Sequence, residues 1–174
     1  ALSDGQFRVV YQPIIRTADR RPVGFEALCR WEHPLYGPIP PSQFIAAAEE
    51  SDFIGDLGEW VLRQTCKQIV ELSEELGVLT PYVTVNVAPS PILAPGFLER
   101  LRDTLISTGA DARLLKIELT ESVLSENLEV ITGVLHRIRA LGCQVLIDDF
   151  GTGYSSLSRL YRLPIDGLNR VPMV

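Results

Sequence analysis

Five short runs of apolar and β-branched residues have the length and composition of β-strands. They are separated by longer segments with helical spacing, and most of them are apolar on both sides of the predicted strand. Strands that bury both faces and alternate with helices are typical of a largely parallel sheet covered by helices. The predicted strands cover residues 7–15, 22–31, 81–88, 114–120 and 143–150.

Between the strands, apolar residues recur at the spacing of one helix face. A helix is predicted from about residue 57 to residue 76, where Gly77 follows as a stop signal. Two more are predicted, one after Pro95 and one from about residue 124 to residue 141. The fold class is therefore α/β, and the pattern alone leaves open whether the sheet is an open doubly wound sheet or a closed barrel.

The composition is that of one folded domain over residues 1–174. With 46% apolar and 22% charged residues, a chain of 174 residues can bury a substantial core. Its formal charge of −6 argues against broad attraction to nucleic acid or to an anionic membrane surface. A ligand that carries phosphate would need a local cationic site.

The three cysteines are typical of buried, reduced thiols. Cys29, Cys66 and Cys143 are odd in number, far apart, and embedded in apolar stretches, which predicts no disulfide framework and favours a reducing cytoplasm. No run of about twenty apolar residues occurs, and the N-terminus lacks a basic-then-apolar signal pattern. We therefore expect neither a membrane span nor secretion.

Polar residues interrupt or end four of the predicted strands. Glu26, Asn86, Glu118 and the adjacent pair Asp148 and Asp149 stand in runs that otherwise look buried. Each one alone is most simply a helix cap or a surface residue. Because the carboxyl ends of parallel strands meet at one edge or mouth, four such strands favour one shared site. An all-oxygen set suits a hard divalent cation, Mg²⁺ or Mn²⁺, better than zinc.

Other catalytic patterns have less support. The glycine-rich stretch GTGYSS, residues 151–156, lacks the lysine of a phosphate-binding P-loop. No histidine is suitably placed for a Ser-His-Asp triad, since His33 precedes Pro34 in a turn-rich stretch and His136 lies in a charged helical segment. A metal site is therefore the favoured chemistry.

Several longer motifs occur in one order along almost the whole chain. They are YQPI (11–14), GFEALCRWEHP (24–34, with Glu26-Ala27-Leu28), VNVAPS (85–90), IELTES (117–122), DDFGTGYSSL (148–157) and LPID (163–166). This set resembles the EAL domains, which take their name from the Glu-Ala-Leu tripeptide. The resemblance implies a modified TIM-type (β/α) barrel whose first strand runs antiparallel to the others.

The same resemblance implies a function in bacterial signalling. It points to a metal-dependent phosphodiesterase that hydrolyses cyclic di-GMP (c-di-GMP) to linear pGpG, in the cytoplasm, as a homodimer, and beside a sensor or GGDEF diguanylate cyclase domain. The alternative is a catalytically inactive EAL domain that acts as a cyclic di-GMP receptor.

Roles for individual residues also follow from the resemblance. Glu26, Asn86, Glu118 and Asp148 would bind one metal ion, and Asp148 would bridge to a second ion that Asp149 also holds. Glu26, Asp148 and Asp149 would be the catalytic set. The substrate would contact Gln12, Glu26, Leu28, Arg30 and Asp149, with the planar fork of Arg30 suited to phosphate. Residues 149–156 resemble the family loop that couples this site to dimerisation.

Some positions depart from the family pattern. Asn169 stands where the family carries a lysine near the catalytic water, and Ala88 and Pro91 stand where many relatives carry Ser and Gln. The sequence also ends at Val174, before the segments that supply a further glutamate and glutamine. We therefore expect a barrel that lacks its C-terminal strands, either because the chain is part of a longer multidomain protein or because the domain is degenerate.

Overall fold

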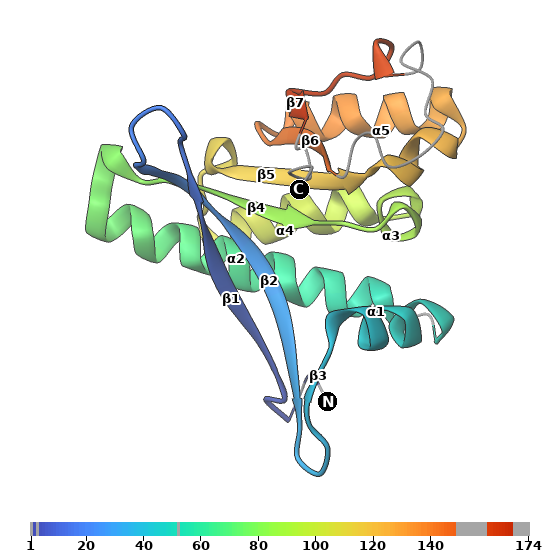
Figure 1. Cartoon of the computed structure of the whole chain (residues 1–174). Coiled ribbons are helices and arrows are strands. Elements are labelled where there is room, and N and C mark those ends of the chain that lie inside the picture. Colours follow the sequence, from blue (N-terminus) through green and yellow to red (C-terminus); the bar gives the residue numbers. More distant parts are fainter. Residues whose placement is uncertain (1, 3, 52, 149–159, 169–174) are drawn as a thin grey trace.

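The structure is a computed structural model of the whole chain, and it describes residues 2, 4–51, 53–148 and 160–168 (Figure 1). Strands and helices alternate after an initial hairpin, as the sequence pattern predicts. Their bounds are β1 (Phe7–Ile15), β2 (Pro22–His33), β3 (Gly37–Ile39), α1 (Pro41–Glu50), α2 (Ile54–Leu76), β4 (Tyr82–Asn86), α3 (Pro89–Leu93), α4 (Phe97–Thr108), β5 (Leu115–Thr120), α5 (Leu128–Ala140), β6 (Gln144–Asp148) and β7 (Gly167–Leu168). Three short 3₁₀ helices cover Gly77–Leu79, Ala112–Leu114 and Glu121–Ser125.

The strands form one mixed sheet in the order β1-β2-β4-β5-β6-β7, with β3 paired to β2. Strand β1 is antiparallel to β2, whereas β2, β4, β5, β6 and β7 are parallel to one another. The connections from β2 to β4, from β4 to β5 and from β5 to β6 each contain at least one helix, which is the usual connection between parallel strands. The antiparallel first strand and the parallel strands that follow confirm the predicted α/β barrel class.

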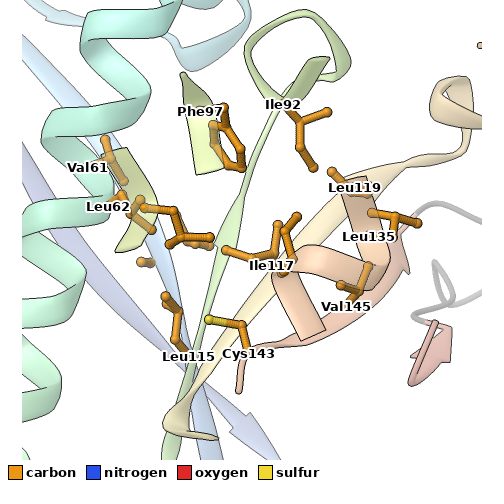
Figure 2. Packing of buried hydrophobic residues seen from close by; sticks show 14 of the residues in the cluster. Val61, Leu62, Ile92, Phe97, Leu115, Ile117, Leu119, Leu135, Cys143 and Val145 are labelled. Atoms are coloured by element: carbon orange, nitrogen blue, oxygen red, sulfur yellow. The ribbon is translucent and has the colours of Figure 1, made fainter. Parts of the chain in front are cut away.

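Alternate residues of the central strands face opposite sides of the sheet. Residues such as Val83, Ile117 and Val145 are fully buried beneath the helices. Figure 2 shows this core: Ile117 and Val145 of the sheet and Leu135 of α5 belong to one buried cluster, while Val61 and Leu62 project from α2. The helices therefore cover one face, and the even-numbered residues of β4, β5 and β6 form the other face, where the polar side chains lie.

The predicted elements are largely confirmed. The first strand has the predicted bounds, and α2 begins three residues earlier than predicted. The helix expected from residue 124 begins only at Leu128, because Asn127 caps it and a 3₁₀ turn precedes it. The predicted strand 143–150 is described as far as Asp148, and its last two residues lie outside the described part.

The three thiols are free, as predicted. Cys66 and Cys143 are buried and Cys29 is partly buried. Burial raises the pKa values of Cys29 and Cys66 to about 11 and that of Cys143 to about 12. Within the described residues, every helix is too short or too polar to cross a bilayer.

Candidate functional site

A cavity of about 310 Å³ lies against the polar face of the sheet. Three of the residues that line it are acidic and were predicted as metal ligands: Glu26, Glu118 and Asp148. They come from strands β2, β5 and β6, so the parallel order of the sheet carries them to one region. Tyr82, Thr84 and Leu146 form the wall between them, with Ile14 and Leu168 at the flanks.

Two of the predicted ligands are in direct contact. The Nδ2 group of Asn86 donates a hydrogen bond of 2.8 Å to Oε1 of Glu26, 60 residues away in sequence. This contact follows from the pairing of β2 with β4, in which Glu26 is opposite Thr84 and Ala27 is opposite Val85. The last residue of β4 therefore reaches across to the Glu-Ala-Leu strand.

Glu118 is the most enclosed of the acidic residues. Its exposed fraction is only 2%, and it pairs in register with Asn86 on the neighbouring strand. The backbone N–H of Val87 donates a 2.9 Å hydrogen bond to the carbonyl of Glu118, which fixes the end of β4 against β5. Because a buried carboxylate is unfavourable without compensating groups, Glu118 depends on the polar and cationic groups packed around it.

Asp148 completes the described part of the acidic wall. It is half-buried at the end of β6, where it pairs in register with Thr120 of β5. Its neighbour Asp149 lies outside the described residues, as does the rest of the loop 149–156 that was predicted to couple this site to dimerisation.

A lysine that the sequence analysis did not single out lies on the same face. Its ammonium is 3.4 Å from the centre of the Tyr82 ring, and Lys116 is two residues before Glu118 on β5. Burial lowers the pKa of Lys116, while the charges of Glu118 and Asp166 act in the opposite direction. Burial, and secondly the charge of Glu118, raise the pKa of Tyr82.

The predicted substrate contacts lie on the hairpin formed by β1 and β2. Gln12 is exposed and stands directly opposite Glu26, so the two side chains share one face of the pair. Leu28 and Arg30 follow Glu26 at two-residue spacing, which places them on that face as well. Nη1 of Arg30 donates a 2.8 Å hydrogen bond to the carbonyl of Cys29.

Two of the three positions that depart from the family pattern, Ala88 and Pro91, lie close to Asn86, and the third, Asn169, lies outside the described residues. Ala88 and Pro91 line a small cavity of about 60 Å³, to which Asn86 also contributes. Pro91 is buried in α3, and Arg100 of α4 forms a 3.5 Å ion pair with Glu59 at the same cavity. Substitutions at Ala88 and Pro91 therefore change the packing between Asn86 and the helices that line this cavity.

The donor types fit a hard divalent cation, because carboxylate and amide oxygens are the ligands such ions prefer. Within the part of the chain that the structure describes, no three His, Cys, Asp or Glu side chains are gathered closely enough to hold an ion. The hydrogen bond from Asn86 to Glu26 points the amide nitrogen at the carboxylate, so binding an ion would require the amide oxygen to turn inward. The described side chains thus include the oxygen donors that a cation site needs, but they do not converge on a single point.

Comparison with known proteins agrees with this geometry. The model of the family described as EAL domain matches residues 1–169. The uncharacterized protein y4lL of Sinorhizobium fredii is 45% identical over 168 residues, covering 95% of this chain and 20% of that protein. The cyclic di-GMP phosphodiesterase NbdA of Pseudomonas aeruginosa is 40% identical, covering 97% of this chain and 21% of that protein.

A solved structure described as PaMucR phosphodiesterase in complex with c-di-GMP is similar in fold as well. It superimposes with a TM-score of 0.89 at 36% identity, covering 97% of this chain and 68% of that one. The chain thus spans only about a fifth of the length of y4lL and NbdA. The match of the family model to almost every residue, together with these relatives, shows that the chain belongs to the EAL domain family.

Proposed function

We propose that this domain hydrolyses cyclic di-GMP to linear pGpG in a reaction that depends on Mg²⁺ or Mn²⁺. The observation that carries the proposal is the joining of Glu26 and Asn86 by a 2.8 Å hydrogen bond, beside buried Glu118, on three adjacent strands. The relatives NbdA and MucR, which are named as phosphodiesterases, support the choice of substrate.

Glu26, Asn86, Glu118 and Asp148 would hold one metal ion, and Asp148 together with Asp149 would hold a second. Divalent ions held there would supply Lewis-acid chemistry, which activates a water for attack and stabilises negative charge on a phosphodiester. The contribution of the protein is to hold oxygen donors in a partly water-excluded cavity, where their charges act more strongly than in bulk water.

The remaining residues bind and orient the substrate. Arg30 supplies a planar set of donors for a phosphate, and Gln12 lies beside Glu26 on the adjacent strand. Leu28 stands between Glu26 and Arg30 on the same face of β2 and offers an apolar contact for the ligand. In this arrangement the hairpin of β1 and β2 would bind the nucleotide, while the oxygen donors of β4, β5 and β6 would hold the ions that bind the reacting phosphate.

The experiment is to compare two glutamate variants of the intact protein that contains this chain. Glu26→Ala should abolish formation of pGpG under metal-replete conditions while leaving the thermal unfolding temperature close to that of wild type. The matched control is Glu75→Ala, because Glu75 is an exposed glutamate on α2, which covers the opposite face of the sheet. Unchanged turnover by the Glu26 variant would remove that residue from the mechanism.

A second candidate is a receptor that binds cyclic di-GMP without cleaving it. The feature that favours it is Asn169, an uncharged residue at the position where the family carries a lysine. Calorimetry with cyclic di-GMP, followed by chromatography of the same sample, distinguishes the two candidates. Saturable binding with no pGpG after prolonged incubation with metal would establish the receptor.

The setting we propose is a cytoplasmic, homodimeric signalling protein with a sensor or GGDEF domain in the same chain. This chain covers only about a fifth of NbdA and of y4lL, which supports the proposal that it belongs to a larger protein. The buried, free cysteines suit a reducing compartment. Light scattering of the intact protein at several concentrations, with and without cyclic di-GMP, measures the dimer.

A further inference from the structure

The chain contains only two lysines, and their surroundings differ sharply. Lys67 is exposed on α2. Lys116 is partly buried on β5, on the face of the sheet that carries the acidic residues. A lysine on an inward-facing position loses hydration and side-chain freedom, so its presence there requires a compensating interaction.

The first compensating interaction is the ring of Tyr82. The ammonium of Lys116 lies 3.4 Å from the ring centre, which is the arrangement of a cation–π contact. The ring itself lies over Gly24 of β2, where a Cβ atom would overlap the ring carbons. Gly24 of β2 therefore leaves room for the Tyr82 ring of β4, and that ring contacts the ammonium of Lys116 on β5.

The second interaction is with the acidic wall. Lys116 and Glu118 are two residues apart on one strand, so they share a face at a separation of about 7 Å along the strand. Tyr82 and Glu118 both line the candidate cavity. At that separation, and shielded partly from water, the attraction between unit charges is significant on the scale of protein stability.

We propose that Lys116 is a built-in counter-ion of the acidic site. Its ammonium, held on the Tyr82 ring, offsets the negative charge of Glu118 in the metal-free protein and so weakens the attraction of the site for a divalent cation. The effect on cation affinity rests on the metal site proposed above, whereas the effect on the metal-free protein depends only on the described residues.

The test replaces Lys116 by methionine, which has a similar shape and no charge. In the intact protein, titration calorimetry with Mn²⁺ alone should show that Lys116→Met binds the ion about tenfold more tightly than wild type, because a repelling charge has been removed. Lys67→Met removes the same charge from the surface of α2 and should change the affinity less than about twofold. Lys116→Arg keeps the charge and should behave like wild type.

A second measurement separates this inference from the metal site itself. In chelator, Lys116→Met should lower the midpoint of urea unfolding, and adding Glu118→Gln should restore most of the loss, because the neutral amide needs no counter-ion. If the wild-type protein shows no saturable Mn²⁺ binding but Glu118→Gln still restores the urea midpoint of Lys116→Met, the proposed metal site is wrong. The assignment of Lys116 as the counter-ion of Glu118 is then supported.

Other outcomes overturn the counter-ion. Equal Mn²⁺ affinity in wild type and Lys116→Met would refute the role of Lys116. A Mn²⁺ affinity of Lys116→Arg equal to that of Lys116→Met would also refute it. If Lys116→Met alone does not fold, recovery of folding by the double variant supports the inference, and failure of both to fold refutes it.

Discussion

Replacing Asp166 by alanine should destabilise the edge of the sheet that carries Asp148. Asp166 immediately precedes β7 and is bonded three times to elements around it. Its Oδ2 accepts a 2.9 Å hydrogen bond from the backbone N–H of Val145, and its own N–H donates to the carbonyl of Val145 at 2.7 Å. Its Oδ1 lies 3.0 Å from Nη2 of Arg139 on α5.

The size of the effect follows from which of these bonds is lost. Val145 is fully buried, so loss of the carboxylate leaves its N–H without that acceptor, at a cost of about 1–3 kcal/mol. The ion pair is more exposed, with 42% of the Arg139 side chain and 22% of Asp166 accessible, and contributes about 0.5 kcal/mol. We therefore expect Asp166→Ala to lower the free energy of unfolding by about 2 kcal/mol.

Urea unfolding followed by circular dichroism measures this difference, provided that the slope m stays constant across the variants. Asp166→Asn keeps an oxygen that can accept from Val145 and should lose only about 0.5 kcal/mol. Arg139→Ala removes the ion pair alone and should lose a similar amount. Equal losses for Asp166→Ala and Arg139→Ala would refute the assignment, because the hydrogen bond to Val145 would then contribute nothing.

Three further predictions concern the thiols, a helix cap and the core. The pKa values of about 11 to 12 for Cys29, Cys66 and Cys143 leave little thiolate at pH 8, so the native thiols should react slowly with a disulfide reagent and quickly in urea. Because Asn127 accepts from the N–H groups of Glu129 and Val130, Asn127→Ala should cost about 1 kcal/mol in chemical denaturation. Ile117→Ala should cost about 2–5 kcal/mol, whereas Ile106→Ala, at a side chain 72% exposed, should cost much less.

The long apolar runs made most of the fold predictable. Strand β1 and helix α2 are sustained patterns, and they appear close to the predicted bounds. The three-residue β3 and the two-residue β7 are too short to show any periodicity, and the one-turn α3 is equally hidden. Helix α1 was missed because only Phe44 and Ala48 of its ten residues are buried, so its apolar stripe is narrow.

The candidate site was partly predictable for a different reason. Glu26, Asn86, Glu118 and Asp148 are conspicuous because each places oxygen in or at the end of an apolar run. Lys116 was missed, since a lysine near the start of a strand is typical of a solvated edge. Only the pairing of β4 with β5 places it against Tyr82. The direct contact between Glu26 and Asn86 likewise depends on strand order, which the pattern does not specify.

The most direct test of the account is turnover of cyclic di-GMP by the intact, metal-stripped protein, measured by chromatography with Mn²⁺ and again with chelator. We expect pGpG to accumulate with the ion and to be absent with chelator. Pronounced binding of cyclic di-GMP with no pGpG under either condition, or equal turnover under both, would contradict a metal-dependent phosphodiesterase.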